Sequence, residues 1–475
     1  MGIVVRQSIK SVIVTLGGVL LGGLIAVLST RFFPKHEMGF RENLIKVSTW
    51  TTYLAMFGFN YTILIWGQKY PPGHEKRSSF LAVTTLIPLI FSVVICALFF
   101  AAEPFLDSIY SPRDAAMMRR YIWLFPLLTF FTCMISWLEG YLQAMHKTAL
   151  QNLGREVIAR IIYIALIILF AFDLISFHTF LWLYVILYIV PFLFLLMIAM
   201  RNPGFHFKYV KGSFSKSEIR EIIGFSGYHM LTAASTVLIL QLDAFLLGPL
   251  GGFEQVAVYS IATLSIAMLR NPTRVIGIAA TPAFSKSYND GDTTGLKDLF
   301  ARSSVNMQII GVGMFALVYV NINNIQEIMA LIKGGFGEIK GLIMILMLGQ
   351  LFDMMTGLNY ELISVTRFFR FNFWIALILM VIVFGLNFLF IKEYGIFGAA
   401  WGTTIGLIIF NIAKAAFLWK KLQMQPFSKA TLYILGAGAV AGGLAWLIPN
   451  LGNVFADGII RSLVFGALMW YALFR

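Results

Sequence analysis

Two arginines, Arg270 and Arg274, lie four residues apart inside a long apolar segment. Side chains four residues apart share one face of a helix, so both guanidinium groups would point the same way. Asn271 and Pro272 lie between them, and a proline removes one backbone hydrogen bond of the helix. Planar guanidinium groups bind phosphate oxygens in pairs. The spacing therefore predicts a phosphate-binding face formed by Arg270, Arg274 and Asn271.

A second interpretation of the same pair is structural. Arg270 would then pair with a carboxylate of another helix, and Arg274 would extend to the aqueous phase along its own stem. Lys46 is a further cation in an apolar segment, and it is included with the phosphate ligands although it also suits an anchor at the membrane rim. Lys414 lies close to Lys420 and Lys421 and is expected to reach the aqueous phase at that end.

Arg155, Glu156 and Arg160 lie within six residues of one another and predict an ion-pair cluster. Other ionisable groups fall at membrane depth, where each is expensive and therefore a functional candidate. They could pair with the arginines, bind a coupling proton or sodium ion, or relay protons. These candidates are Glu139, Asp243, Asp353, Glu361 and His229.

Catalytic motifs are missing from the sequence. There is no phosphate-binding glycine loop of the Walker type, no metal-ligand spacing and no nucleophile beside a base. The two cysteines, Cys96 and Cys133, both lie in apolar runs and are expected to be buried thiols. We therefore expect a protein that is not an enzyme and that uses no metal or cofactor, apart from coupling to a proton or sodium gradient.

The composition indicates which kind of secondary structure carries these ionisable residues. Of 475 residues, 59% are apolar and 12% are charged, whereas soluble domains average about 45–50% and about 25%. Such a chain cannot form the polar surfaces of several soluble domains, which excludes soluble enzymes, disordered proteins and disulfide scaffolds. The sequence predicts an all-α polytopic membrane protein.

Apolar runs of about 20 residues, the length that crosses the hydrocarbon core, occur fourteen times. They lie near residues 9–32, 43–68, 79–100, 121–142, 156–172, 179–200, 222–248, 253–282, 304–332, 341–365, 371–391, 397–419, 430–448 and 456–474.

Loop charges orient these spans. With the N-terminus inside, cytoplasmic segments hold 21 basic residues and the opposite segments hold 10. Cytoplasmic loops are enriched in Lys and Arg, so the bias favours both termini inside. The net charge of +14 is thereby explained mostly by topology, and a nucleic-acid partner is not expected.

The basic segment 201–221 divides the chain into a six-helix bundle at 1–200 and a second at 222–420, followed by two further helices at 421–475. This linker is expected to lie on anionic lipids. Similar motifs recur in the two halves: Leu142, Lys147 and Asn152 match Leu362, Arg367 and Asn372, and the Gly-Phe pair at 39–40 matches the pair at 252–253. The spacing predicts parallel repeats.

Glycines four residues apart predict close helix contacts. They occur at 18 and 22, at 398, 402 and 406, and at 438 and 442.

Several segments resemble bacterial oligosaccharide flippases, the polysaccharide-transporter branch of the multidrug/oligosaccharidyl-lipid/polysaccharide (MOP) exporter superfamily. The segments that carry the resemblance are residues 6–10 (RQSIK), 58–60 with 68–70, 282–285 (PAFS) with 289–292 (NDGD), and 394–400 (YGIFGAA).

The resemblance implies two helical bundles in a V around a central cavity, working by alternating access in the bacterial cytoplasmic membrane. The implied cargo is an undecaprenyl-pyrophosphate-linked oligosaccharide, moved from the cytoplasmic to the outer leaflet. Glycan polymerase and ligase proteins would be the partners in the same pathway. The sugar is not specified by the resemblance.

Three alternatives stay open. A lipid II flippase would share the span number but typically carries arginines in its first span, and residues 11–30 hold no charge. A cation-coupled antiporter would typically place an aspartate and a proline there. A glycan polymerase or scaffold would typically add a large external loop.

Overall fold

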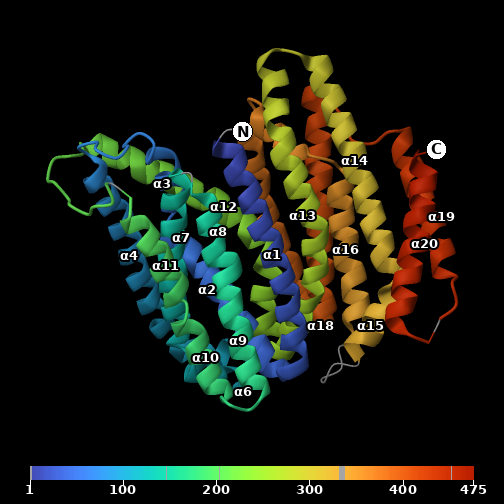
Figure 1. Ribbon diagram of the computed structural model, residues 1–475, viewed down its shortest axis with the longest axis horizontal. Helices are drawn as coiled ribbons and strands as arrows, with labels where there is room; N and C mark the ends of the chain where they lie inside the picture. Colours follow the sequence, from blue (N-terminus) through green and yellow to red (C-terminus); the bar gives the residue numbers. More distant parts are fainter. Residues whose placement is uncertain (1–2, 146, 203, 331–336, 451, 475) are drawn as a thin grey trace. The chain divides into compact units, whose positions relative to one another are not determined.

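A computed structural model describes residues 3–145, 147–202, 204–330, 337–450 and 452–474 (Figure 1). Throughout this part of the chain the regular secondary structure is helical, which confirms the predicted all-α class. The helices are α1 (Ile3–Phe32), α2 (Lys35–Met56), α3 (Phe59–Trp66), α4 (Arg77–Ala102), η1 (Glu103–Phe105), α5 (Leu106–Ile109), α6 (Pro112–Arg120), α7 (Leu124–Ala144), α8 (Thr148–Asn152), η2 (Leu153–Ile158), α9 (Ala159–Ala171), α10 (Phe177–Ile186), α11 (Ile189–Met200), α12 (Lys216–Gly251), α13 (Phe253–Asn289), α14 (Thr293–Val320), α15 (Ile322–Ala330), α16 (Ile339–Met355), α17 (Asn359–Val365), α18 (Phe369–Leu422), α19 (Lys429–Trp446) and α20 (Val454–Phe474).

The contacts divide the chain into two compact units. Unit 1 holds residues 1–238 and 252–254, and unit 2 holds residues 239–251 and 255–475. The division falls inside α12, so one continuous helix contributes to both units. The bundle boundaries predicted at 201–221 and at 421 stay predictions.

Unit 1 is built around α2 and α7, with α4 beside both and α1 beside α8 and α9 (Figure 1). The chain turns sharply between α2 and α3, where Phe57 and Gly58 have φ of 47° and 77°. A side chain at Gly58 would also collide with the neighbouring chain, because an added Cβ would lie 2.1 Å from the Ser226 carbonyl oxygen. Only glycine meets both demands.

Unit 2 is built around α16 and α18, with α14 between α16 and α19 and with α20 against α19 (Figure 1). Two of its spans are broken. The pair α16 and α17 bends by 43°, and α18 changes direction at Gly395, where φ is 55° and ψ is −130°. That conformation is accessible to glycine and to almost no other residue.

The predicted glycine stripes are confirmed as close contacts. Gly18 and Gly22 of α1 face Glu156 and Arg160, and the glycines at 398, 402, 406 and 438 face side chains or backbone at similarly short range. A Cβ on Gly442 would be in ordinary contact, 3.6 Å from Ala316. On Gly438 of α19, an added Cβ would lie 2.3 Å from Val312 of α14. Small residues therefore bring these helices together at distances that larger residues would prevent.

Each of the fourteen predicted spans falls on one helix or on consecutive helices. Within the described residues, six helices are long and apolar enough to cross a membrane alone, and the bent pair α16–α17 makes a seventh. The count of fourteen stays a prediction.

Candidate functional site

The predicted phosphate ligands lie on two units. Arg270 and Asn271 are exposed on α13, which continues as a helix through Pro272. The side chain of Arg274 lies outside the described residues. Lys46 is half-buried on α2 in unit 1. Their joint binding of phosphate stays a prediction.

Of the five coupling candidates, Glu139 and His229 belong to unit 1 and the other three to unit 2. His229 stacks on Tyr61 with ring centroids 5.2 Å apart. It also contacts Phe225, at 4.5 Å between centroids. An imidazole with two aromatic neighbours is held mainly by packing.

Glu139 is buried on α7 and lies 3.6 Å from the Arg155 guanidinium. Its Oε1 atom is buried without a hydrogen-bond partner. Arg155 also lies 3.9 Å from Glu156, which pairs in turn with Arg160. The ion-pair cluster predicted from the spacing is confirmed, and Glu139 extends it into the helix bundle.

Asp243 is 3% exposed on α12 and has two hydroxyl neighbours. Tyr259 of α13 donates a hydrogen bond to Asp243 Oδ2, and Thr403 of α18 donates another at 3.2 Å. Three helices of unit 2 are thereby joined through one carboxylate. Hydroxyl donors stabilise a buried carboxylate without neutralising it.

A larger polar group lies at the break between α16 and α17, and we call it the α16–α17 cluster: Gln350, Asp353, Glu361, Asn411 and Lys414. Asn411 of α18 is fully buried and donates to Asp353 Oδ1 at 2.8 Å. Gln350 donates to the other oxygen, Oδ2, at 3.0 Å.

Asn411 also links side chains on the two sides of the break. Its Oδ1 accepts hydrogen bonds from Thr356 at 3.2 Å and from Asn359 at 3.4 Å, which lie on either side of the break. The amide thereby connects α16, α17 and α18.

Lys414 lies one turn beyond Asn411 and is 2% exposed. The expectation that it reaches the aqueous phase beside Lys420 is wrong, because its stem and ammonium group are enclosed. Its Nζ lies 4.1 Å from the centre of the Phe410 ring. Asp353 and Glu361 are its charged neighbours at longer range. The cluster thus combines one buried ammonium group with two half-buried carboxylates.

Glu361 also faces α13. A Cβ added to Gly277 would lie 2.6 Å from Glu361 Oε1, so the carboxylate occupies the space that the glycine leaves. Gly277 is three residues after Arg274 in the sequence. The predicted phosphate helix and the predicted coupling carboxylate are therefore neighbours within unit 2.

Unit 1 holds its own buried cations. Arg41 is 2% exposed; it donates to Ser29 Oγ at 3.0 Å, pairs with Glu42 and lies 5.2 Å from the Tyr163 ring. Sequence reasoning assigned Arg41 to an external loop. A carboxylate, a hydroxyl and an aromatic ring thus compensate this guanidinium group, although its Nε is buried without a hydrogen-bond partner.

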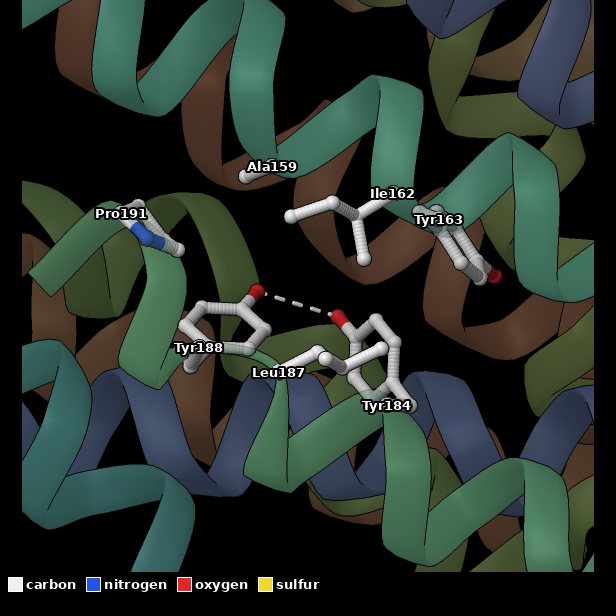
Figure 2. Close-up of a pocket in the computed structure, with 7 residues that line it drawn as sticks. All are labelled: Ala159, Ile162, Tyr163, Tyr184, Leu187, Tyr188 and Pro191. Atoms are coloured by element: carbon white, nitrogen blue, oxygen red, sulfur yellow. Dashed lines mark hydrogen bonds between the residues drawn. The ribbon is translucent and has the colours of Figure 1, made fainter. Parts of the chain in front are cut away.

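Tyr163 also lines a small pocket between α9, α10 and α11 (Figure 2). The pocket measures about 10 Å³, the space of a single water molecule. The Tyr184 and Tyr188 hydroxyls meet across it at 3.1 Å. This pocket can accept a hydroxyl group or a water molecule but not a sugar ring.

Arg77 is the second buried arginine of unit 1, at 3% exposure. Its guanidinium donates to the Tyr70 carbonyl at 2.6 Å, to the Gly204 carbonyl at 3.0 Å and to the Tyr141 hydroxyl at 3.3 Å. Sequence reasoning counted it as a loop charge. Its role in the structure is to join the first turn of α4 to two chain segments.

Comparison with known proteins gives the family. A family model described as polysaccharide biosynthesis protein matches residues 4–288, more than half of the chain. The chain belongs to this family. A comparison with curated proteins finds no significant match.

Solved structures give the fold of this polysaccharide biosynthesis protein. The lipid II flippase MurJ in an inward closed conformation matches 99% of this chain and 100% of its own, with a TM-score of 0.72 and 16% identity. A multidrug resistance MATE family transporter of the MOP superfamily, in an inward-facing conformation, matches 85% of this chain and 94% of its own, with a TM-score of 0.71 and 13% identity. A MOP superfamily transporter from Pyrococcus furiosus matches 89% and 95%, with a TM-score of 0.58 and 14% identity.

These matches confirm the predicted superfamily and its transporter fold. Together with the apolar helices, they indicate a multi-pass membrane protein. The structures with this fold are described as a lipid II flippase and a multidrug resistance transporter.

Among the residues of this polysaccharide biosynthesis protein that sequence reasoning missed, Lys414 and Asn411 stand out. Both lie on α18 three residues apart, so the spacing placed them on one face. The burial of that face against the break after α16 depends on tertiary packing and has no local signal.

Proposed function

We propose that this protein carries an undecaprenyl-pyrophosphate-linked oligosaccharide from the cytoplasmic to the outer leaflet of a bacterial cytoplasmic membrane. The match of the family model over residues 4–288 is the observation that carries the proposal. The fold shared with MOP-superfamily structures supports alternating access as the way of moving the cargo. Both termini would be cytoplasmic, as the loop charges predict.

Cations on the transport path are required by the cargo. A pyrophosphate group does not enter hydrocarbon unaccompanied, because an isolated charge loses its hydration there. Exposed Arg270 and Asn271 on α13, together with Arg274 and half-buried Lys46, are the proposed escorts. Arginine suits this role because its two parallel donors fit phosphate oxygens.

The test is translocation in vesicles. Purified protein is reconstituted with a fluorescent undecaprenyl-pyrophosphate oligosaccharide, and a membrane-impermeant quencher reports which leaflet holds the label. We expect protein-dependent exchange between leaflets in the native protein and its loss in Arg270→Glu. Lys286→Glu, an exposed charge reversal on the same helix, is the matched control and should retain transport. No exchange by the native protein would contradict the proposal.

Lipid II transport is the second candidate, and the fold match to the lipid II flippase MurJ favours it. The uncharged stretch 11–30 argues against it, as does the family description. The same vesicles loaded with fluorescent lipid II separate the two. Faster exchange of lipid II than of the oligosaccharide would reassign the cargo.

For the energy source we propose coupling through the α16–α17 cluster. Two ionised carboxylates and one ammonium group leave a net negative charge on Asp353, Glu361 and Lys414, which one proton or sodium ion balances. Arg274 lies three residues before Gly277, the α13 residue that faces Glu361, and the side chain of Arg274 lies outside the described residues. Imposed pH and sodium gradients across the vesicles identify the ion, and Glu361→Gln should abolish the response.

Pathway partners follow from the proposed cargo. A flipped lipid-linked unit must next be polymerised or transferred to an acceptor, so glycan polymerase and ligase proteins are the proposed partners. The glycan can belong to O-antigen, capsule or exopolysaccharide. Sugar analysis of lipid-linked intermediates that accumulate when the gene is removed would identify it.

A further inference from the structure

The segment between α11 and α12 has an unusual surface for a loop. Residues 205–210 have no regular secondary structure, and the side chains of Phe207, Tyr209 and Val210 are 49%, 54% and 48% exposed. Lys208 and Lys211 alternate with them and are also exposed. Large apolar side chains are expected to face lipid on a helix of a membrane protein, but in a loop they need another explanation.

Contacts with α4 and α7 of unit 1 hold the backbone of this segment in place. Phe205 is buried and contacts the Tyr141 ring at 5.1 Å between centroids. Ser79 Oγ accepts a hydrogen bond from the Val210 N–H at 3.0 Å, and Arg77 donates to the Gly204 carbonyl at 3.0 Å. The Phe207 ring packs on Phe205 and Trp137, at 5.0 and 5.9 Å between centroids, and the fixed backbone leaves about half of the Phe207, Tyr209 and Val210 side chains exposed.

The attachment points place the segment at the ends of two spans. One span-length helical stretch ends at Met200, directly before the segment. Another begins at Arg77, whose first turn supplies the contacts from Arg77 and Ser79. A chain tied to the first turn of one span and continuous with the end of another lies at the depth of the lipid headgroups.

The charge of the segment indicates which kind of surface it contacts. Residues 201–220 contain five basic residues and one carboxylate, Glu218. That carboxylate pairs with Lys76 at 2.8 Å, outside the loop, so it does not neutralise the loop lysines. The alternation of aromatic rings and lysines is what an anionic interface binds, because rings favour the headgroup region and ammonium groups favour lipid phosphates.

We infer that residues 205–211 form an interfacial anchor that binds anionic phospholipid headgroups. Phe207, Tyr209 and Val210 enter the headgroup layer, while Lys208 and Lys211 contact lipid phosphates. This inference concerns the lipid surface and does not depend on the cargo proposed above.

The test measures the environment of residue 210. Val210→Cys is made with Cys96→Ser, and Cys133 is kept because it is fully buried. The full chain is labelled with a fluorescent maleimide and placed in nanodiscs of phosphatidylcholine alone or mixed with phosphatidylglycerol. Acrylamide, which is uncharged, then quenches whatever part of the label is in water.

We expect less quenching in anionic nanodiscs than in neutral ones. Each lysine near an anionic surface contributes about 1 kcal/mol, so Lys208→Glu with Lys211→Glu should weaken the docking equilibrium by about 30-fold, or ~2 kcal/mol. Raising the salt concentration to ~1 M should also weaken docking and increase quenching, because the electrostatic screening length falls to ~3 Å. Phe207→Ser with Tyr209→Ser should also restore quenching, through loss of ring insertion.

Lys286→Glu with Lys297→Glu is the control pair, since both lysines are exposed, lie outside the loop and change the net charge equally. This variant should behave as the native chain. Equal quenching in neutral and anionic nanodiscs would overturn the inference. Protection that requires added soluble protein would overturn it as well, because the surface would then serve a protein partner.

Discussion

The buried cations of the two units are compensated in different ways. In unit 1, Arg41 and Arg77 meet carboxylate, hydroxyl, carbonyl or ring partners within hydrogen-bond or ring-contact distance. In unit 2, Lys414 lies over the Phe410 ring with two carboxylates at longer range. Burial alone therefore does not mark a functional charge.

The difference follows from the residue types. Arginine keeps its proton under all ordinary conditions and presents donors in a fixed fork, which suits permanent links between helices. Lysine can release a proton when buried, and nearby carboxylates can take one up. We therefore interpret the arginines of unit 1 as structural and the lysine of unit 2 as the group to test for coupling.

The largest effect should come from Lys414→Met. Removing the ammonium group leaves Asp353 and Glu361 enclosed without their cation, and gradient-driven transport in vesicles should fall to background. Lys414→Arg is the sharper variant, because it keeps the charge but not a readily released proton. Full transport by either variant would remove the distinction between the two units.

Arg461→Met tests whether a buried cation is structural because it is an arginine or because it lies in unit 1. Arg461 lies in unit 2 but pairs with Asp457 at 3.0 Å and with the Ile448 carbonyl at 2.8 Å, so it resembles the arginines of unit 1. Removing it leaves a buried carboxylate without its cation, which costs about 3–5 kcal/mol.

The measurement is thermal unfolding in detergent, together with transport by the protein that remains folded. We expect a lower Tm with normal transport. Adding Asp457→Asn should recover much of the loss, since no charge is then left unpaired. Loss of transport at normal Tm would instead make Arg461 a functional charge.

Arg77→Met should destabilise unit 1 somewhat less. The change leaves the Tyr70 and Gly204 carbonyls without their donor, at about 1–3 kcal/mol for each buried group. The Tm should fall, whereas Arg113→Met should leave it unchanged because Arg113 is exposed. An unchanged Tm in Arg77→Met would show that water replaces the guanidinium group at this position.

The smallest effect concerns the exposed pair Lys76–Glu218. The hydrogen bond from Lys76, followed by the backbone N–H of Ser215, lowers the pKa of Glu218 to about 2. A carboxyl pKa lowered by folding stabilises the protein above its ordinary value near 4.5, and this contribution is lost as the pH falls towards 2. Glu218→Gln should flatten the Tm profile over that range, with a small loss of Tm above about pH 4.5, pH 7 included, that disappears towards pH 2.

Local patterns predicted much of the fold. The apolar runs predicted segments that are helical in the structure. Glycines four residues apart predicted the close contacts at Gly18, Gly22 and Gly438. Both features depend on neighbours along one helix, so the sequence alone shows them. The ion pairs of Glu156 had the same local origin.

The candidate site was less predictable. The break between α16 and α17 is stabilised by Asn411, which is about fifty residues away in the sequence, and Lys414 is buried by the same packing. Arg41 and Arg77 lie near span ends, where sequence cannot distinguish a loop charge from an enclosed one. Each of these positions is decided by partners on other helices.

The bend at Gly395 has a consequence for how the protein is made. Two long apolar stretches within Phe369–Leu422 are joined through this one non-helical residue, with no intervening loop. The two stretches should therefore leave the translocation channel together as a helical hairpin, each covering the polar groups of the other. Replacing Gly395 with a β-branched residue would then act first on membrane insertion during synthesis, before any folded protein exists.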